Sequence, residues 1–242
     1  MSPSEDTVKT ARSMFLRGER VGAQNLLNGI LAEDPHNGRA WEMLGAIHHS
    51  QGAVEEAIYA LEEATALRPL TVGGQFAIAD CYLAKGHVDA AEVVYQDLAD
   101  GDRLPDNLLP DVVRALDTIG DYSRALRLSR RAMKKVPTCA DAHYGVGYYL
   151  TKLGHKSESV LPYFSRAVQL APENVSYRVT LASLYLQLGK GDEAFNVLGS
   201  LTSGQLSLLH CPNCIQKFAD VYEAFGDLAK RDVCLARIRQ LD

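Results

Sequence analysis

Apolar residues recur at helical spacing along the chain, and the segment 41–69 shows the pattern most clearly. In its first half, Leu44 and Ile47 lie three residues apart and so share one face of a helix. The second half repeats this spacing, with Gly52 between the halves and Pro69 after the second. Because glycine readily ends a helix and proline cannot continue one, the pattern predicts two helices joined by a turn.

The same signals return about every 34 residues. The glycines expected to end a first helix are spaced by 34, 34, 34, 34, 35 and 37 residues, at Gly18, Gly52, Gly86, Gly120, Gly154, Gly189 and Gly226. Prolines close several second helices, at Pro35, Pro69, Pro137 and Pro172. Small residues recur where two helices should cross, at Ala23, Ala57, Ala91, Ala125 and Ala194. A fixed period of this length indicates a repeat architecture, and seven repeats account for nearly the whole chain.

Each residue type in the repeat has a physical reason. Alanine at the crossing lets two helix backbones approach, and glycine adopts the backbone angles that turn the chain. Proline ends a second helix and fits the first turn of the next one. A single pair of helices cannot bury its apolar face alone, so stability must come from stacking neighbouring repeats.

These residues resemble the tetratricopeptide-repeat family. The second repeat matches the family's signature positions with Trp41, Leu44, Gly45, Ala57, Leu61, Ala64 and Pro69, and departs from them only at His48, where an aromatic residue is usual. The resemblance implies an all-α fold, a right-handed α-solenoid of about seven helix-turn-helix repeats. A single solenoid is expected over 1–242, with repeats at about 4–37, 38–71, 72–105, 106–139, 140–174, 175–208 and 212–242.

The repeat is least regular in three places. Residues 99–111 contain Asp, Gly and two prolines where the third repeat should end, and Pro110 is expected to delay the next helix. Pro162 lies near the expected start of the second helix of the fifth repeat. Residues 199–213 form a longer join before the last repeat, whose final helix is expected at about 228–241.

Composition restricts the class of protein. The chain has 242 residues, of which 47% are hydrophobic, but its apolar stretches are far shorter than the roughly 20 residues that span a membrane, so no membrane insertion is expected. The start of the chain lacks the apolar stretch of a secretory signal. Five widely spread cysteines do not indicate a disulfide framework. Together these features predict a cytoplasmic location.

Charge is unevenly distributed. The formal net charge is -5, but residues 1–119 carry -10 and residues 120–242 carry +5. One hypothesis is self-association through these oppositely charged ends. The other is chance variation among solvated helix faces.

A basic helix in the second half does not predict binding to nucleic acid. Arg127, Arg131 and Lys134 share one face of the helix expected at 124–135. This is the second helix of its repeat, which the family places on the outer side, and no aromatic residues alternate with the charges. The acidic pI of about 5.8 also fits nucleic acid poorly, so a solvated face is the favoured interpretation.

No catalytic motif is present. The sequence has no phosphate-binding glycine loop, no HExxH and no GxSxG, so neither an enzyme nor a cofactor is expected. The strongest local oddity is His210 with the CxxC pair Cys211 and Cys214. Two thiols at this spacing are candidates for zinc, with His210 and Cys234 as further ligands, or for a redox pair. A structural zinc site needs four ligands and no second CxxC follows, so the favoured interpretation is no metal and two thiols beside the start of a helix.

The resemblance also implies where a partner binds, because in this family the first helix of each repeat lines a concave groove. The side chains expected there are Arg12, Glu42, His49, Phe76, Asp80, Arg114, Tyr144, Tyr148, Lys152, Val179 and Leu186. Aromatic and apolar surface with a charged rim is typical of peptide capture. The alternative for each aromatic residue is packing between repeats.

We therefore expect a scaffold or adaptor that binds a peptide or helix of an unidentified protein partner in its groove. One alternative is a cytoplasmic chaperone of a bacterial secretion system, since some short members of this repeat family have that role. The other is a self-assembling structural module. These expectations rest on analogy at the level of the fold.

Overall fold

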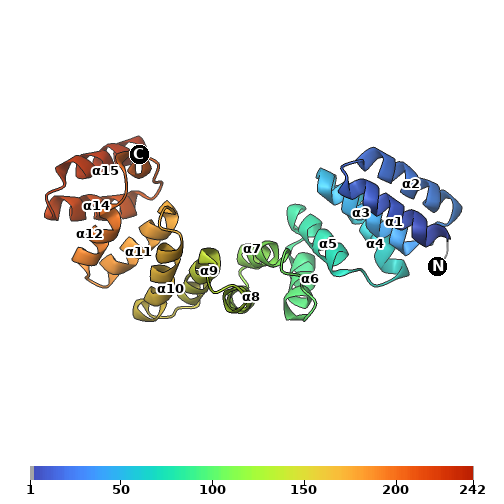
Figure 1. Ribbon diagram of the computed structural model, residues 1–242, viewed down its shortest axis with the longest axis horizontal. Coiled ribbons are helices and arrows are strands. Elements are labelled where there is room, and N and C mark those ends of the chain that lie inside the picture. The colour runs from blue at the N-terminus through green and yellow to red at the C-terminus, as the bar shows by residue number, and fades with distance from the viewer. Residues whose placement is uncertain (1–2, 242) are drawn as a thin grey trace. The chain divides into compact units, whose positions relative to one another are not determined.

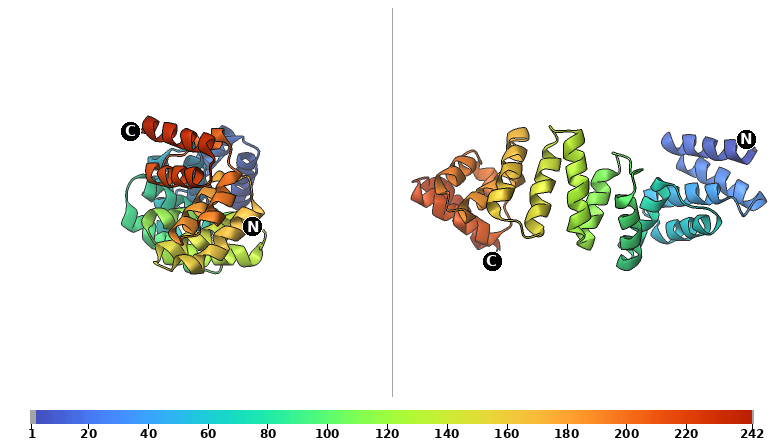
Figure 2. Two further views of the ribbon diagram at one scale, coloured as in Figure 1. Left: turned by 90° about the vertical axis from the view of Figure 1, so that its left-hand side faces the viewer. Right: turned by 90° about the horizontal axis from the view of Figure 1, so that it is seen from below.

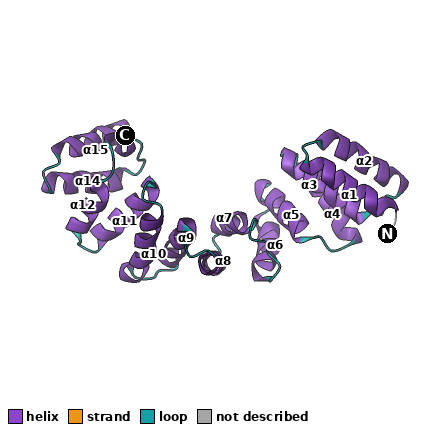
Figure 3. Ribbon diagram, viewed as in Figure 1, coloured by secondary structure: helices purple, strands orange, loops and turns teal. Residues whose placement is uncertain are grey.

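The structure, a computed structural model, describes residues 3–241, and all regular structure in that range is helical (Figures 1 and 3). The all-α fold class that the family resemblance implied is therefore confirmed. The helices are α1 (Pro3–Leu16), α2 (Arg20–Glu33), α3 (Gly38–Gln51), α4 (Val54–Leu67), α5 (Val72–Ala84), α6 (Val88–Asp100), α7 (Leu109–Ile119), α8 (Tyr122–Lys135), α9 (Ala140–Lys152), α10 (Ser157–Leu170), α11 (Val175–Gln187), α12 (Gly191–Gly199), α13 (Ser203–Leu206), α14 (Pro212–Ala224) and α15 (Leu228–Leu241).

Consecutive helices pack as pairs, as in an α-solenoid. The most extensive contacts join α1 with α2, α3 with α4, α5 with α6, α9 with α10, α11 with α12, and α14 with α15. The last of these pairs lies side by side in each view of the chain (Figures 1 and 2). The helices with extensive contacts pack on the helix next to them or next but one along the chain.

The turn glycines have the backbone angles that the period predicts. All seven have a positive φ, between 69° and 93°, and no other residue in the range 3–241 does. Gly52 shows the reason, because it follows α3 in the left-handed region and its N–H donates to the carbonyl of His49 at 3.0 Å. A residue with a Cβ is strained at such angles, so glycine is the residue that ends the helix there.

The crossing of α3 and α4 is close because its residues are small. A Cβ on Gly45 would lie 2.5 Å from Cγ of Leu61 and 3.3 Å from the carbonyl oxygen of Ala57. Ala57 and Leu61 are fully buried. The side chain of Leu61 therefore fills the space that glycine leaves open.

The chain divides into two compact units, the first ending at Ala125 and the second beginning at Leu126, inside α8. Each has its own core. That of the first unit includes Leu27, Ile30, Leu31, Leu44 and Ile47, and that of the second includes Leu198, Leu201, Leu206, Ile215, Phe218 and Tyr222. The single continuous solenoid over 1–242 stays a prediction.

Irregular sequence produces local changes without breaking the pattern. Residues 101–108 contain no helix, and α7 begins at Leu109 with Pro110 in its first turn, as predicted. Pro162 lies inside α10, five residues after the helix begins. The join before α14 contains the short helix α13, which the sequence pattern did not predict. No helix in the part of the chain that the structure describes has the length and apolar character required to cross a membrane.

Candidate functional site

The first unit has a pocket of about 520 Å³ that is lined only by first helices of successive repeats. We call it the groove pocket; its lining residues are His49 from α3, Phe76, Asp80 and Leu83 from α5, and Asp111, Arg114, Ala115 and Thr118 from α7. Four residues expected from the sequence to face a partner, His49, Phe76, Asp80 and Arg114, are thus brought together.

The histidine of the groove pocket is held in place by two neighbours. Nε2 of His49 lies 2.7 Å from a carboxylate oxygen of Asp80, and the ring meets that of Phe76 edge to face, with centroids 6.0 Å apart. The hydrogen bond from His49 lowers the pKa of Asp80, against the opposing effect of burial. Asp80 is therefore ionised at neutral pH, so the pocket combines a fixed negative charge with an apolar wall.

Helix α7 contributes an ion pair to the lining of the groove pocket. Arg114 pairs with Asp111 one turn earlier on α7. The side chain of Arg114 is 74% exposed, and ion pairs of this kind contribute little to stability. The guanidinium can therefore exchange Asp111 for a carboxylate on a ligand at small cost, and its planar donors suit such a group.

Tyr95, from the second helix α6, supports the groove pocket and was not expected from the sequence. It is fully buried, and its ring meets that of Phe76 edge to face at 6.3 Å. Burial first, and then the negative charge of Asp80, raise the pKa of the Tyr95 phenol. Tyr95 therefore stays neutral, and its buried ring packs against Phe76 and supports that side chain in the pocket wall.

The predicted aromatic residues of the second unit form a cluster. The ring of Tyr144 stacks on Tyr177 at 4.6 Å and meets Phe164 edge to face at 5.3 Å. The ring centroids of Tyr148 and Tyr144 lie 6.3 Å apart. Nζ of Lys152 lies 5.4 Å from the centroid of the Tyr148 ring. Tyr144 therefore packs between repeats, which was the alternative interpretation, whereas Tyr148 and Lys152 extend the cluster along α9.

The remaining predicted residues take different positions. Glu42 is buried and its carboxylate bonds to Arg68 and Thr71, so it is occupied within the fold instead of facing a partner. Arg12 is exposed on α1, outside the groove pocket. Val179 and Leu186 are half-buried and pack against the core of the second unit.

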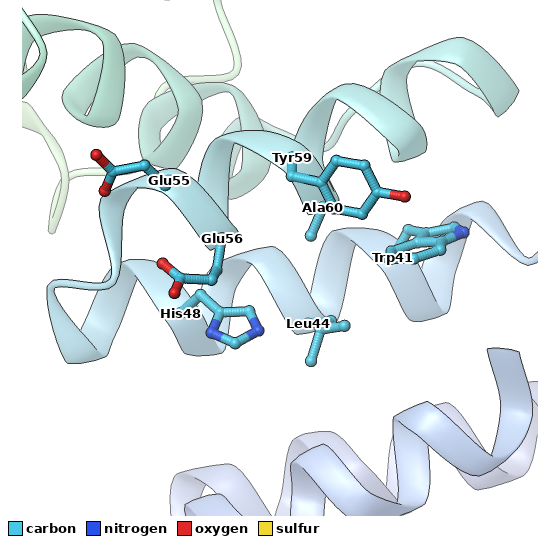
Figure 4. Close-up of a pocket in the computed structure, with 7 residues that line it drawn as sticks. All are labelled: Trp41, Leu44, His48, Glu55, Glu56, Tyr59 and Ala60. Carbon is cyan, nitrogen blue, oxygen red and sulfur yellow. The ribbon is translucent and has the colours of Figure 1, made fainter.

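A second pocket, of about 410 Å³, lies between the two helices of one repeat, α3 and α4 (Figure 4). Trp41 and Tyr59 lie at one end, with their rings 5.7 Å apart and nearly perpendicular. His48, Glu55 and Glu56 lie at the other end. The repeat pattern did not predict a pocket on this surface.

The cysteine pair lies at the start of α14. The sulfur atoms of Cys211 and Cys214 are 2.7 Å apart. Cys234 is fully buried, and Nδ1 of His210 lies 3.2 Å from a guanidinium nitrogen of Arg237. In the described part of the chain, no three His, Cys, Asp or Glu side chains form a group that could hold a metal ion.

Comparison with known proteins agrees with the helical-repeat fold of the structure. Residues 17–70 and 113–175 match the model of the tetratricopeptide-repeat family. No curated protein matches the chain in sequence.

Several solved structures are similar in fold. The C-terminal part of a repeat-containing protein from Cytophaga hutchinsonii has a TM-score of 0.67 at 14% identity, over 97% of this chain and 95% of that one. A tetratricopeptide repeat protein from Parabacteroides merdae has a TM-score of 0.58 at 15% identity, over 98% and 92%. YrrB, described as having an unusual peptide-binding site, has a TM-score of 0.59 at 14% identity, over 72% and 93%.

Proposed function

The chain belongs to the tetratricopeptide-repeat family, whose members are protein-interaction scaffolds, and we propose that it binds a peptide segment of a partner protein in the groove pocket. The observation that carries the proposal is that three successive first helices contribute to one concave site of about 520 Å³. Small-molecule and peptide sites are typically concave, with apolar walls and a few placed polar groups.

The chemistry of the groove pocket indicates what the peptide contains. Phe76 and Leu83 provide an apolar wall for one aliphatic or aromatic side chain of the ligand. Arg114 is suited to a carboxylate on the peptide, because its exposed ion pair with Asp111 can be exchanged for one with the ligand. Asp80 accepts a hydrogen bond from His49 and carries a negative charge. A ligand group placed beside Asp80 should therefore be a hydrogen-bond donor. The proposed ligand therefore carries an apolar anchor residue with an acidic group nearby.

In the second unit, Tyr148 and Lys152 are the residues we propose for further contact with a partner. Both lie on α9, and the ring of Tyr148 is half-buried beside the ammonium group of Lys152. A side chain with two rotatable bonds and a polar tip provides contact area at low entropic cost.

The test is to select peptides from a random displayed library on the wild-type protein and then to measure their affinity by fluorescence anisotropy. Phe76→Ala should weaken binding by about tenfold or more, because the apolar anchor loses its wall. Arg114→Ala should weaken binding of acidic peptides, and more so at low salt. Since Arg114 is exposed, that variant keeps the test valid if Phe76→Ala lowers stability.

Matched controls lie in the same unit outside the groove pocket. Val93, which is 61% exposed on α6, controls for loss of apolar surface, and Arg103, in the join before α7, controls for loss of positive charge. Val93→Ala and Arg103→Ala should change the affinity by less than about twofold. Equal affinity for wild type, Phe76→Ala and Arg114→Ala would show that peptides bind elsewhere. If only Tyr148→Ala lowers the peptide affinity, the binding site lies in the second unit instead.

A further inference from the structure

The cysteine pair at the start of α14 forms a site that peptide binding does not use. Cys211 is exposed and is the N-cap residue of α14, and Cys214 lies one turn later and is half-buried. Their sulfur atoms are 2.7 Å apart. We propose that Cys211 and Cys214 form a thiol–disulfide exchange site that reacts with small-molecule disulfides such as oxidised glutathione, with Cys211 as the attacking thiolate and Cys214 as the resolving thiol.

The position of Cys211 favours its thiolate. The backbone N–H of Cys214 points at Sγ of Cys211, at 3.4 Å, as a donor does at the N-terminus of a helix. The positive end of the helix dipole stabilises a negative charge there. The contact with the Cys214 thiol lowers the pKa of Cys211, with backbone N–H groups and Lys217 acting in the same direction. Cys211 is also the more exposed thiol of the pair, so a reagent in solution reaches it more readily.

Cys214 has the opposite environment. It is half-buried and packs against the core of the second unit, and burial raises its pKa, with the neighbouring Cys211 adding to the effect. A protonated, shielded thiol beside an exposed thiolate is the arrangement in which one sulfur attacks first and the other resolves. The two sulfurs need to approach by less than an ångström to reach the bond length of about 2.05 Å.

The reaction balances with one molecule of oxidised glutathione. The Cys211 thiolate attacks one sulfur of glutathione disulfide, which breaks that disulfide, forms a Cys211–glutathione bond and releases one glutathione thiolate. Cys214 then loses its proton to solvent and attacks Sγ of Cys211. This step forms the Cys211–Cys214 disulfide and releases a second glutathione, so two electrons pass from the protein to the reagent.

Metal binding is the rival role for these thiols, and the surrounding residues favour exchange. Cys234 is buried among apolar side chains of the core, and His210 faces Arg237, whose guanidinium also donates to the carbonyl of Leu209. A structural zinc site takes four ligands. Among the residues that the structure describes, no third His, Cys, Asp or Glu side chain joins the two sulfurs as a possible metal ligand.

The experiment treats the reduced full-length protein with oxidised glutathione, quenches with acid, alkylates the remaining thiols and reads the intact mass. The wild type should lose two thiols and retain no glutathione. Cys214→Ser should stop at the mixed disulfide and retain one glutathione on Cys211. Cys211→Ser should react more slowly than the wild type by about tenfold or more, because Cys214 is shielded and protonated.

The matched control is Cys139→Ser, which removes a half-buried thiol outside the pair and should behave as the wild type. Melting temperatures of the three variants establish that each is folded. Three results would overturn the proposal: Cys211→Ser reacting as fast as the wild type, a wild-type product that keeps glutathione without forming the internal disulfide, or tightly bound zinc that protects both thiols in the purified protein.

Discussion

The carboxylate of Glu42 joins one repeat to the next. It accepts hydrogen bonds from Arg68, at the end of α4, and from the backbone N–H of Thr71 at 2.8 Å, just before α5. The hydroxyl of Thr71 also donates to it. A Cβ on Gly74 would collide with this carboxylate, so the glycine makes room for the network. Glu42 therefore fixes how the chain passes from one pair of helices to the next.

Replacement of Glu42 by alanine should be strongly destabilising. Removing the buried carboxylate leaves the half-buried guanidinium of Arg68 and the backbone N–H of Thr71 without their acceptor, which costs about 2–3 kcal/mol. Urea unfolding followed by circular dichroism measures this cost. Glu56→Ala, at an exposed acid of α4, is the control and should change the free energy of unfolding by less than about 0.5 kcal/mol. A similar small effect for both variants would mean that the Glu42 network contributes little.

Glu42 and Phe76 also show what the sequence can and cannot predict about the site. The 34-residue period repeats one helix face, so it predicts which side chains of successive first helices come near each other, and Phe76 and Arg114 do line one pocket. The period cannot predict that Arg68 and Thr71 approach Glu42, because that depends on distances across the join. Tyr95 was missed for a similar reason, since it reaches the pocket wall from a second helix.

At the scale of elements, the close crossing of α3 and α4 depends on glycine for space and not for backbone angles. Gly45 lies in the interior of α3 and its space is filled by Leu61. Gly29 lies in the interior of α2, and a Cβ added there would have no atom within 4 Å. Both glycines are thus in a helix interior, but a Cβ would be crowded at Gly45 and would meet no atom at Gly29.

The same substitution at these two glycines should therefore have opposite effects. Gly29→Ala should stabilise the protein by about 0.5–1 kcal/mol, because alanine has the higher helix propensity. Gly45→Ala gains the same propensity but crowds Leu61 and the backbone of Ala57, and overpacking of this kind costs about 1–3 kcal/mol. Thermal unfolding of both variants provides the measurement. A stabilised Gly45→Ala would show that α3 and α4 separate easily.

Helix α13 shows where element prediction from the sequence stops. Thr202 and Gln205 form a capping box, and the pattern is visible in the sequence, but a helix of four residues is too short to show a period of 3.6. Leu206 at its end is nevertheless fully buried in the core of the second unit. The long helices were predictable because each spans several turns of apolar spacing, as in α4.

At the scale of the molecule, the stability of each region should depend mainly on the helices packed next to it. The extensive helix–helix contacts join neighbours along the chain, and each unit has its own core. In such proteins the stability is approximately a sum over repeats and the interfaces between neighbours. Damage to one core should therefore remain local.

Hydrogen exchange read by mass spectrometry tests this locality. Leu61→Ala removes a fully buried side chain of the first unit and should cost about 2–5 kcal/mol, with faster exchange in α3 to α6 and little change in α14 and α15. Phe218→Ala, at a fully buried residue of the second unit, should reverse the pattern. Uniformly faster exchange along the whole chain in both variants would instead mean that the protein unfolds as one cooperative block.

The short range of these contacts also bears on how the chain is made. A helix needs only partners that have already been synthesised or will follow within a few tens of residues, since its main contacts reach no further than the next helix but one. Proteins with such local contacts fold quickly compared with the pace of translation. Each pair of helices can therefore close as it leaves the ribosome, and the growing chain exposes the apolar face of only its newest repeat.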